Sequence, residues 1–245
     1  MKSLKMFLAY YMIIFSSVAF SQNISISMEG NRLLKKVDRN LTPVSFESYR
    51  KLINIEPNGR KKEFILYAAK KGKDKMVTTF LSPKTELGRS TLRLGDNMWL
   101  YIPNVGKPVR ITSMQSVTGG IFNNSDIMRL DYNEEYNCVN LEKGKEKYFL
   151  TLKAKTGSVA YDKLTMTIDK KNIMPTEIKC YTASNMLIKT LYFKKIKTFS
   201  KNITRPAVIE TDSPLHKGYR SFMIYAKMKE RNFADEVFTM QQMTR

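Results

Sequence analysis

The chain has 245 residues, of which 42% are hydrophobic, and its formal net charge at pH 7 is +20. A chain of this length and composition can bury one large core, and β-rich chains of this size often form a single domain. So basic a chain is attracted to anionic headgroups or acidic partners, which leaves peripheral contact with an anionic membrane open. Its lysines are spread through nearly every predicted strand and turn, and it carries no nucleic-acid-binding motif, so we expect no nucleic-acid partner.

Residues 1–21 have the pattern of a secretory signal peptide. Lys2 and Lys5 precede an apolar run from Met6 to Phe15, and Ala19-Phe20-Ser21 is a small-residue cleavage pattern. A retained membrane anchor is less favoured, because the apolar run is short and two serines follow it. We therefore expect cleavage after Ser21, export, and one mature domain at residues 22–245.

The mature chain is predicted to begin with a helix and to continue as strands. Between Asn31 and Leu41 the apolar residues share one helical face, and Thr42-Pro43 ends the helix. Short strand-like runs follow, and Pro57-Asn58-Gly59 and Lys71-Gly72-Lys73-Asp74 are hairpin turns. Such short connections predict one antiparallel sheet of eleven to thirteen strands that curls or closes. The predicted strands are 44–55, 60–70, 75–81, 90–94, 98–102, 109–111, 137–141, 147–153, 163–169, 176–181, 186–197, 203–211 and 219–228.

The stretch from Gly95 to Asp131 is the most informative part of the sequence. Its strand Met98–Ile102 is apolar or aromatic on both faces, which predicts cover on both sides. After a return strand that carries Arg110, the apolar residues Ile121 and Phe122 follow a Gly-Gly break. Ser125-Asp126 is then expected to cap a short helix at residues 125–131. We interpret this stretch as an apolar cavity with a mobile lid.

The order and spacing of several motifs resemble the LolA-like outer-membrane lipoprotein-sorting family. The matching segments are Phe80-Leu81-Ser82-Pro83, Leu92-Arg93-Leu94-Gly95, Gly95 to Pro103, Gly106 to Ile111, Ser125-Asp126, Phe233 to Thr239 and the final Arg245. The resemblance covers nearly all of the chain after the first two dozen residues. One departure is Asn123-Asn124, where a small glycine-like residue is expected before the lid helix.

The resemblance implies a mainly β fold, an incomplete, half-open antiparallel β-barrel of about eleven strands with a short helical lid. It also implies a soluble periplasmic carrier that shelters the acyl chains of lipoproteins between the inner and outer membranes. Its partners would be acylated lipoproteins or lipids, an inner-membrane transporter and an outer-membrane acceptor. Two alternatives stay open: a carrier of free lipid or another hydrophobe serving an inner-membrane exporter, and a periplasmic lipoprotein sensor that transports nothing.

The predicted site combines the cavity wall with the lid. Of the two faces of Met98–Ile102, we favour Trp99 and Tyr101 as facing inward, because flat rings pack well against acyl chains. Arg110 could contact a headgroup, bond lid carbonyls, or be a solvated arginine. The predicted lining residues are Met76, Phe80, Met98, Trp99, Leu100 and Tyr101 from strands, Leu33, Leu34 and Val37 from the first helix, and Ile121, Phe122, Ile127 and Met128 from the lid.

The sequence offers little for catalysis. Its one histidine, His216, lies in a turn, and we find no nucleophile elbow, phosphate-binding loop or dinucleotide motif. We therefore expect neither an enzyme nor a bound metal or cofactor. Cys138 and Cys180 both lie in strand-like runs of one predicted sheet, so we expect them to lie close enough to bridge. They would then either form a disulfide or remain buried thiols.

Overall fold

Thirteen strands pair in a single antiparallel sheet in the computed structural model, which describes residues 25–116 and 118–244. The predicted signal peptide lies outside the described residues. The number of strands agrees with the upper end of the predicted range. The strands are β1 (Ser45–Ile55), β2 (Lys61–Lys71), β3 (Lys75–Ser82), β4 (Ser90–Leu94), β5 (Asn97–Tyr101), β6 (Val109–Ile111), β7 (Tyr136–Lys143), β8 (Lys147–Ala154), β9 (Lys163–Asp169), β10 (Met174–Tyr181), β11 (Leu187–Ser200), β12 (Ile203–Asp212) and β13 (Arg220–Glu230).

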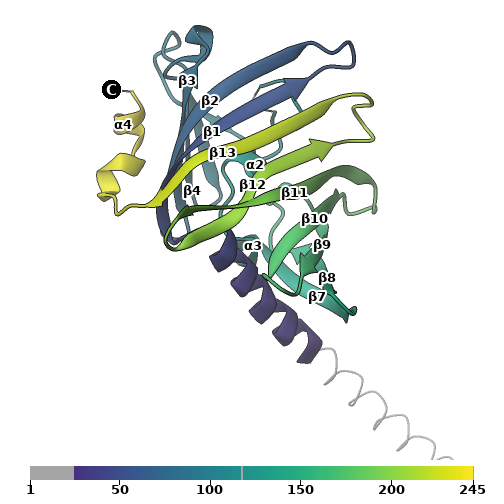
Figure 1. Cartoon of the computed structure of the whole chain (residues 1–245). Coiled ribbons are helices and arrows are strands. Elements are labelled where there is room, and N and C mark those ends of the chain that lie inside the picture. The colour runs from purple at the N-terminus through teal and green to yellow at the C-terminus, as the bar shows by residue number, and fades with distance from the viewer. Residues whose placement is uncertain (1–24, 117, 245) are drawn as a thin grey trace, which may run out of the picture.

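The sheet is curved but not closed. Its strand order is β6-β5-β4-β3-β2-β1-β13-β12-β11-β10-β9-β8-β7, so β6 and β7 are its two edges. The first six strands and the last seven form two runs of neighbours, which meet where β1 pairs with β13. Figure 1 shows the resulting curve, with one concave face, called the inner face here, and one convex, outer face. The prediction of a half-open antiparallel barrel is therefore confirmed.

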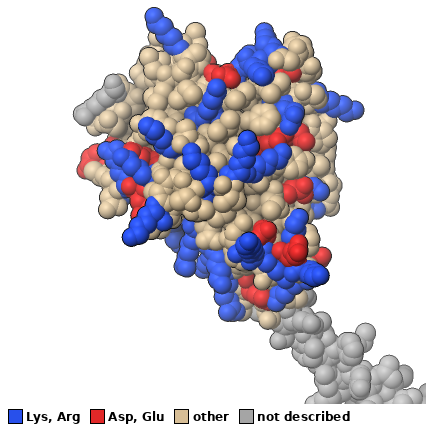
Figure 2. Space-filling model, viewed as in Figure 1, with Lys and Arg blue, Asp and Glu red and all other residues tan. Residues whose placement is uncertain are grey.

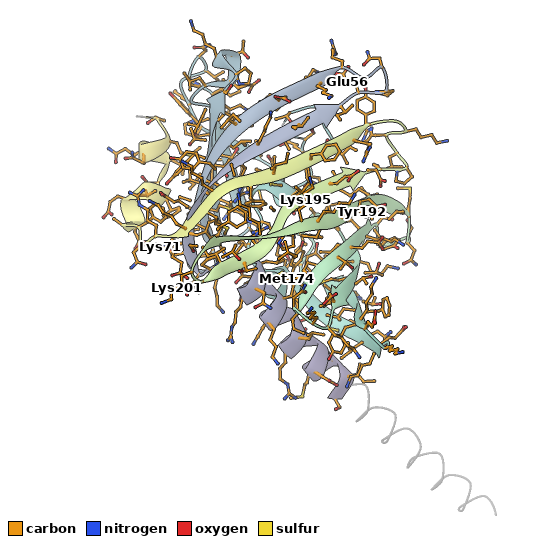
Figure 3. The ribbon with its side chains drawn as sticks, in the orientation of Figure 1. Glu56, Lys71, Met174, Tyr192, Lys195 and Lys201 are labelled. Atoms are coloured by element: carbon orange, nitrogen blue, oxygen red, sulfur yellow. The ribbon has the colours of Figure 1, made fainter. Side chains whose placement is uncertain are left out.

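Alternation of side chains separates the two faces. In β9 the buried residues are Leu164, Met166 and Ile168, and the residues between them are only half-buried. The inner-facing residues of most strands join one large apolar cluster inside the curve of the sheet. Figure 3 shows side chains filling this space. The two predicted hairpin turns place Gly59 and Gly72 at φ 82° and 65°, the left-handed region that glycine adopts without strain.

A helix at residues 25–41 packs across the opening of the curved sheet (Figure 1). The predicted helix from Asn31 to Leu41 is therefore only its second part. Leu34 and Val37 are fully buried in the inner cluster, as the helical spacing predicts. A side chain at Gly30 would place its Cβ 2.1 Å from the Sγ of Cys138, so only glycine allows the helix to lie this close to β7.

Residues 118–135 lie on the inner face and are called the covering segment. They contain two single-turn helices, α2 (Asn124–Ile127) and α3 (Tyr132–Glu135), where the sequence predicted one helix at 125–131. The cap is also different, because Asn123 accepts a hydrogen bond from the Asp126 backbone N–H and Asp126 accepts one from that of Asn123. The departure from the family pattern at Asn123 thus forms a reciprocal capping box.

The C-terminal segment, residues 233–243, lies on the outer face beside β2–β5 (Figure 1). It contains the short helices η2 (Asp235–Phe238) and α4 (Met240–Met243), and a further short helix, η1 (Lys84–Glu86), follows β3. Phe238 and Met243 form a second apolar cluster with Ala69 and Leu92. Within the described part of the chain, helices are too short or too polar to cross a membrane.

Candidate functional site

The inner face of the sheet, the helix at residues 25–41 and the covering segment enclose one apolar interior. Most of the predicted lining residues are brought together in it, and Ile121, at the start of the covering segment, is also buried. Leu33 is partly buried against the same cluster. The predicted residues that are buried in the inner cluster are Leu34, Val37, Met76, Phe80, Met98, Phe122, Ile127 and Met128.

The inward orientation predicted for Trp99 and Tyr101 is wrong. Met98 is 2% exposed and belongs to the inner cluster, whereas Trp99 and Tyr101 pack against the outer cluster around Phe238. Leu100 alternates with them and is half-buried. The strand needs apolar residues on both faces because the C-terminal segment covers its outer face.

The interior is closed in this structure. Its cavity measures ≈ 40 Å³ and lies between the 25–41 helix, the covering segment and strands β1 and β11–β13. That volume suits a few water molecules, whereas sites for drug-sized ligands occupy about 300–1,000 Å³. A long acyl chain therefore fits inside only if the covering elements move.

Buried cations from the sheet hold the covering segment through its backbone. Arg50 of β1 donates to the carbonyl of Ile127 over 2.9 Å, and Arg93 of β4 donates to that of Met128 over 3.1 Å. Lys189 of β11 donates to the carbonyl of Ile121 over 2.5 Å. All three side chains are at most 3% exposed. Three different strands thus fix successive parts of the covering segment.

The same segment carries carboxylates that pair with two of these cations, Lys189 and Arg93, and with a third buried cation, Lys70 of β2. Asp126 lies 2.8 Å from Lys189, Glu135 lies 2.5 Å from Arg93, and Asp131 lies 2.5 Å from Lys70. Burial alone would raise the pKa of Asp126, but the charges of Lys189 and Arg129 hold it below its ordinary value. Asp126 therefore stays ionised, and its ion pair joins the covering segment to β11.

Asp38 joins the helix at residues 25–41 to the covering segment. Its carboxylate accepts hydrogen bonds from the backbone N–H groups of Tyr132 and Asn133, over 2.8 and 2.9 Å. Burial raises the pKa of Asp38 to about 7, although these two bonds act in the opposite direction. The protonation of this contact therefore changes near neutral pH.

A close approach at the start of the covering segment explains the Gly-Gly break. A Cβ on Gly120 would lie 2.1 Å from the side-chain oxygen of Asn54, so a larger residue does not fit there. Asn54 in turn accepts a bond from Ser221, and Ser221 accepts one from the backbone N–H of Ile121. These contacts seat the segment against β1 and β13.

Arg110 takes no part in holding the covering segment. It is exposed on β6 and donates to the side chain of Asn97. The carbonyl contacts considered for it are made instead by Arg50 and Arg93, which were not among the predicted site residues. One signal was present: Arg50 lies two residues before the buried Leu52, so alternation places it on the inner face.

The disulfide considered for Cys138 and Cys180 is not formed, and the expectation that they lie close enough to bridge is wrong. Both are buried free thiols. In the ladder, Cys138 pairs with Leu152, Leu152 with Leu164, and Leu164 with Cys180. Three strand spacings of about 4.8 Å separate the two cysteines, well beyond the roughly 7 Å that a bridge allows.

Comparisons with known proteins agree with this architecture. Residues 72–245 match a family model described as "-like: Uncharacterized protein". No curated protein matches the chain. A LolA superfamily protein from Nitrosomonas europaea is similar at 25% identity, with a TM-score of 0.77 over 85% of this chain and 96% of the other.

Two further solved structures share the fold. An outer membrane lipoprotein-sorting protein domain from Vibrio parahaemolyticus is 17% identical, with a TM-score of 0.74 over 89% of this chain and 100% of the other. A DUF1329 family protein from Desulfovibrio piger is 20% identical, with a TM-score of 0.76 over 89% of this chain and 99% of the other. The resemblance to LolA-like proteins expected from the sequence is therefore confirmed.

Proposed function

We propose that this chain is a periplasmic carrier of lipoprotein acyl chains. The chain belongs to the family whose model matches residues 72–245, and it has the LolA-like fold. It would receive its cargo from an inner-membrane transporter and pass it to an outer-membrane acceptor. The observation that supports this most is the apolar interior, which is covered by two short elements and not sealed by the sheet itself. We propose a binding role for this interior and not a catalytic one.

The energetics of an acyl chain suit such an interior. Each methylene removed from water contributes about 0.8 kcal/mol, so transfer of a long acyl chain contributes on the order of 10 kcal/mol. The inner cluster supplies the apolar surface, from Met76 and Phe80 on β3 to Ile178 on β10. A carrier that binds an acyl chain this favourably also needs a way to release it. Closure of the covering elements over the sheet would displace the chain.

Opening requires the covering segment to leave the inner face. Phe122, Ile127 and Met128 now occupy the space that acyl chains would take. A ligand that binds only the open form shifts the population toward that form by its differential affinity. Closed protein and loaded protein are thus two states of one equilibrium, in which the segment's own apolar side chains compete with the cargo.

The test is binding of a fluorescent acyl probe to the mature protein, together with intact mass spectrometry of protein purified from native periplasm. Phe80→Asp puts a carboxylate on the inner face of β3, which stays in place when the covering segment opens, and an unpaired charge against an acyl chain is costly. The variant should weaken probe binding at least tenfold. Leu81→Asp is the matched control, because Leu81 is 40% exposed on the outer face of β3, beside the inner-facing Phe80.

A second interior variant, Met166→Glu on β9, guards against an effect peculiar to Phe80, and circular dichroism checks that each variant is folded. Folded interior variants that bind the probe as tightly as the Leu81→Asp control would overturn the proposal. An acylated protein that co-purifies identifies lipoprotein cargo, whereas a free lipid identifies the alternative carrier.

A further inference from the structure

Two arginines meet in the interior on the same aromatic ring. Arg50 of β1 lies with its guanidinium carbon 5.0 Å from the centre of the Tyr225 ring, and Arg205 of β12 lies 3.9 Å from it. Arg50 is 3% exposed and Arg205 is 2% exposed, and both line the ≈ 40 Å³ cavity. Two like charges are therefore held together, shielded from bulk solvent, at the wall of the proposed cargo site.

Among the residues that the structure describes, neither guanidinium has a carboxylate partner. Arg50 donates to Ser48 Oγ, to the Ile127 carbonyl and, over 3.9 Å, to the sulfur of Met223. The bonds of Arg205 go to the carbonyl of its neighbour Pro206 and, over 2.7 Å, to that of Leu41. Burial lowers the pKa of Arg50, Tyr225 acts in the opposite direction, and nearby Arg205 lowers it again.

The closest carbonyl bond of each arginine comes from a covering element. Ile127 belongs to the covering segment, and Leu41 is the last residue of the helix at residues 25–41. Opening for an acyl chain would remove both carbonyls. Two buried guanidinium groups would then face the cavity, and a buried charge without a partner costs several kcal/mol. Hydrocarbon cannot replace the lost bonds.

The other buried cations of the inner face also depend on the covering segment for their partners. Arg93, Lys70 and Lys189 also point inward and are at most 3% exposed, and their carboxylate partners all lie in residues 126–135. The two buried glutamates on described strands, Glu47 and Glu210, pair instead with partially exposed Lys or Arg. Removal of the covering segment would therefore leave an inner face with several cations.

We propose that the cargo of this interior carries an anionic phosphate or carboxylate group, which binds between Arg50 and Arg205 in place of the Ile127 and Leu41 carbonyls. The inference rests on the proposed carrier function and narrows its cargo to anionic amphiphiles. Guanidinium groups bind phosphate and carboxylate through paired, charge-assisted hydrogen bonds. The acyl chains would take the apolar surface that Phe122 and Met128 leave.

The experiment compares two fluorescent lipid probes with the same acyl chains, phosphatidate and diacylglycerol, in 0.3 M salt to screen the basic exterior. The wild-type protein should bind the phosphatidate probe at least tenfold more tightly. The double variant Arg50→Gln/Arg205→Gln should bind the two probes about equally. Lys195→Gln/Lys227→Gln is the matched control, because it removes two charges from exposed positions of β11 and β13, and it should keep the wild-type preference (Lys195 is labelled in Figure 3).

The outcomes distinguish a failure of the proposed carrier function from a failure of the anionic-cargo inference. If the folded wild-type protein binds neither probe, the carrier function fails and this inference fails with it. Equal binding of both probes by the wild type leaves the carrier function standing and overturns the inference, and this comparison needs no variant to fold. If inorganic phosphate alone stabilises the wild type but not the double variant, and the lipid preference is absent, the site binds a free anion and the amphiphile proposal is wrong.

Discussion

The covering segment and the C-terminal segment are held to opposite faces of the sheet by different interactions. On the inner face, residues 118–135 are held by buried cations that bond backbone carbonyls and carboxylates. On the outer face, residues 233–243 pack through aromatic side chains, with Phe233 and Phe238 in an edge-to-face contact at 5.9 Å. The C-terminal segment's ion pairs, from Asp235 to Lys71 and Lys75, are partly exposed.

This difference determines which of the two segments a ligand can displace from the sheet. Directional bonds to a few fixed cations can be replaced by another acceptor, such as an anionic group. Apolar packing against Trp99 and Tyr101 offers no such replacement. We therefore expect the inner covering to move during function and the outer one to remain part of the scaffold.

The largest effect is expected from Asp126→Asn. The substitution leaves Lys189 in the interior without its carboxylate and leaves Arg129 with Glu135 alone. Loss of one partner of a buried pair costs about 3–5 kcal/mol. Urea unfolding should show that loss, and amide exchange should be fastest in residues 121–130. Unchanged exchange there would show that charge does not hold the covering segment.

Phe238→Ala should destabilise the protein somewhat less, by about 3 kcal/mol, because it removes a buried ring from the small outer cluster. Acyl-probe binding should stay at the wild-type level in the variant. Weaker binding of the probe by folded Phe238→Ala protein would contradict the assignment of the C-terminal segment to the scaffold.

At Asp38 the expected effect depends on pH and is smaller over any one pH unit. Its folded-state pKa, about 7, lies above the ordinary value of 3.8, so the folded protein binds a proton that the unfolded chain has released. Between about pH 4 and pH 7, stability should therefore fall as pH rises, by up to about 1.4 kcal/mol per pH unit. Unfolding of wild type and Asp38→Asn across this range isolates the contribution, which the variant should lack. Parallel pH profiles for the two proteins would contradict it.

The smallest effect is expected at Asp235, whose carboxylate is exposed. Hydrogen bonds from Lys75 and Lys71 lower its pKa to about 2, so its contribution is present at neutral pH and is lost only as pH falls toward 2. Water screens such pairs, and Asp235→Asn should unfold at the same urea concentration as the wild type at pH 7. A clear shift in that midpoint would show that charge also holds the outer covering.

The strands were predictable because each carries its own local signal. Alternation and turn residues located all thirteen, and the helical spacing of Leu34 and Val37 located the first helix. Which face of β5 looks inward was not predictable, since both faces are apolar and the outer cover comes from residues more than a hundred positions away. The cysteines could not be placed without the strand order.

The cations of the site were hidden for a different reason. A single basic residue in a strand, such as Arg50 or Lys189, resembles the many solvated lysines of this chain, which Figure 2 shows spread over the visible surface. What distinguishes these two residues is burial, and burial depends on the covering segment, whose fold is set by long-range contacts. The cap at Asn123 was missed because the serine two positions later is also a good helix cap.

The pairing of β1 with β13, called the seam here, has a consequence for folding. β1 pairs with β2 next to it in sequence, but its other neighbour, β13, is the last strand in the described part of the chain. Ordering so long an intervening stretch before the seam forms is slow, because the entropy of loop closure precedes the gain from pairing. Until β13 arrives, one side of β1 is an open strand edge available to other chains. Truncations that remove β13 should therefore aggregate during refolding, even though every strand of the first half is intact.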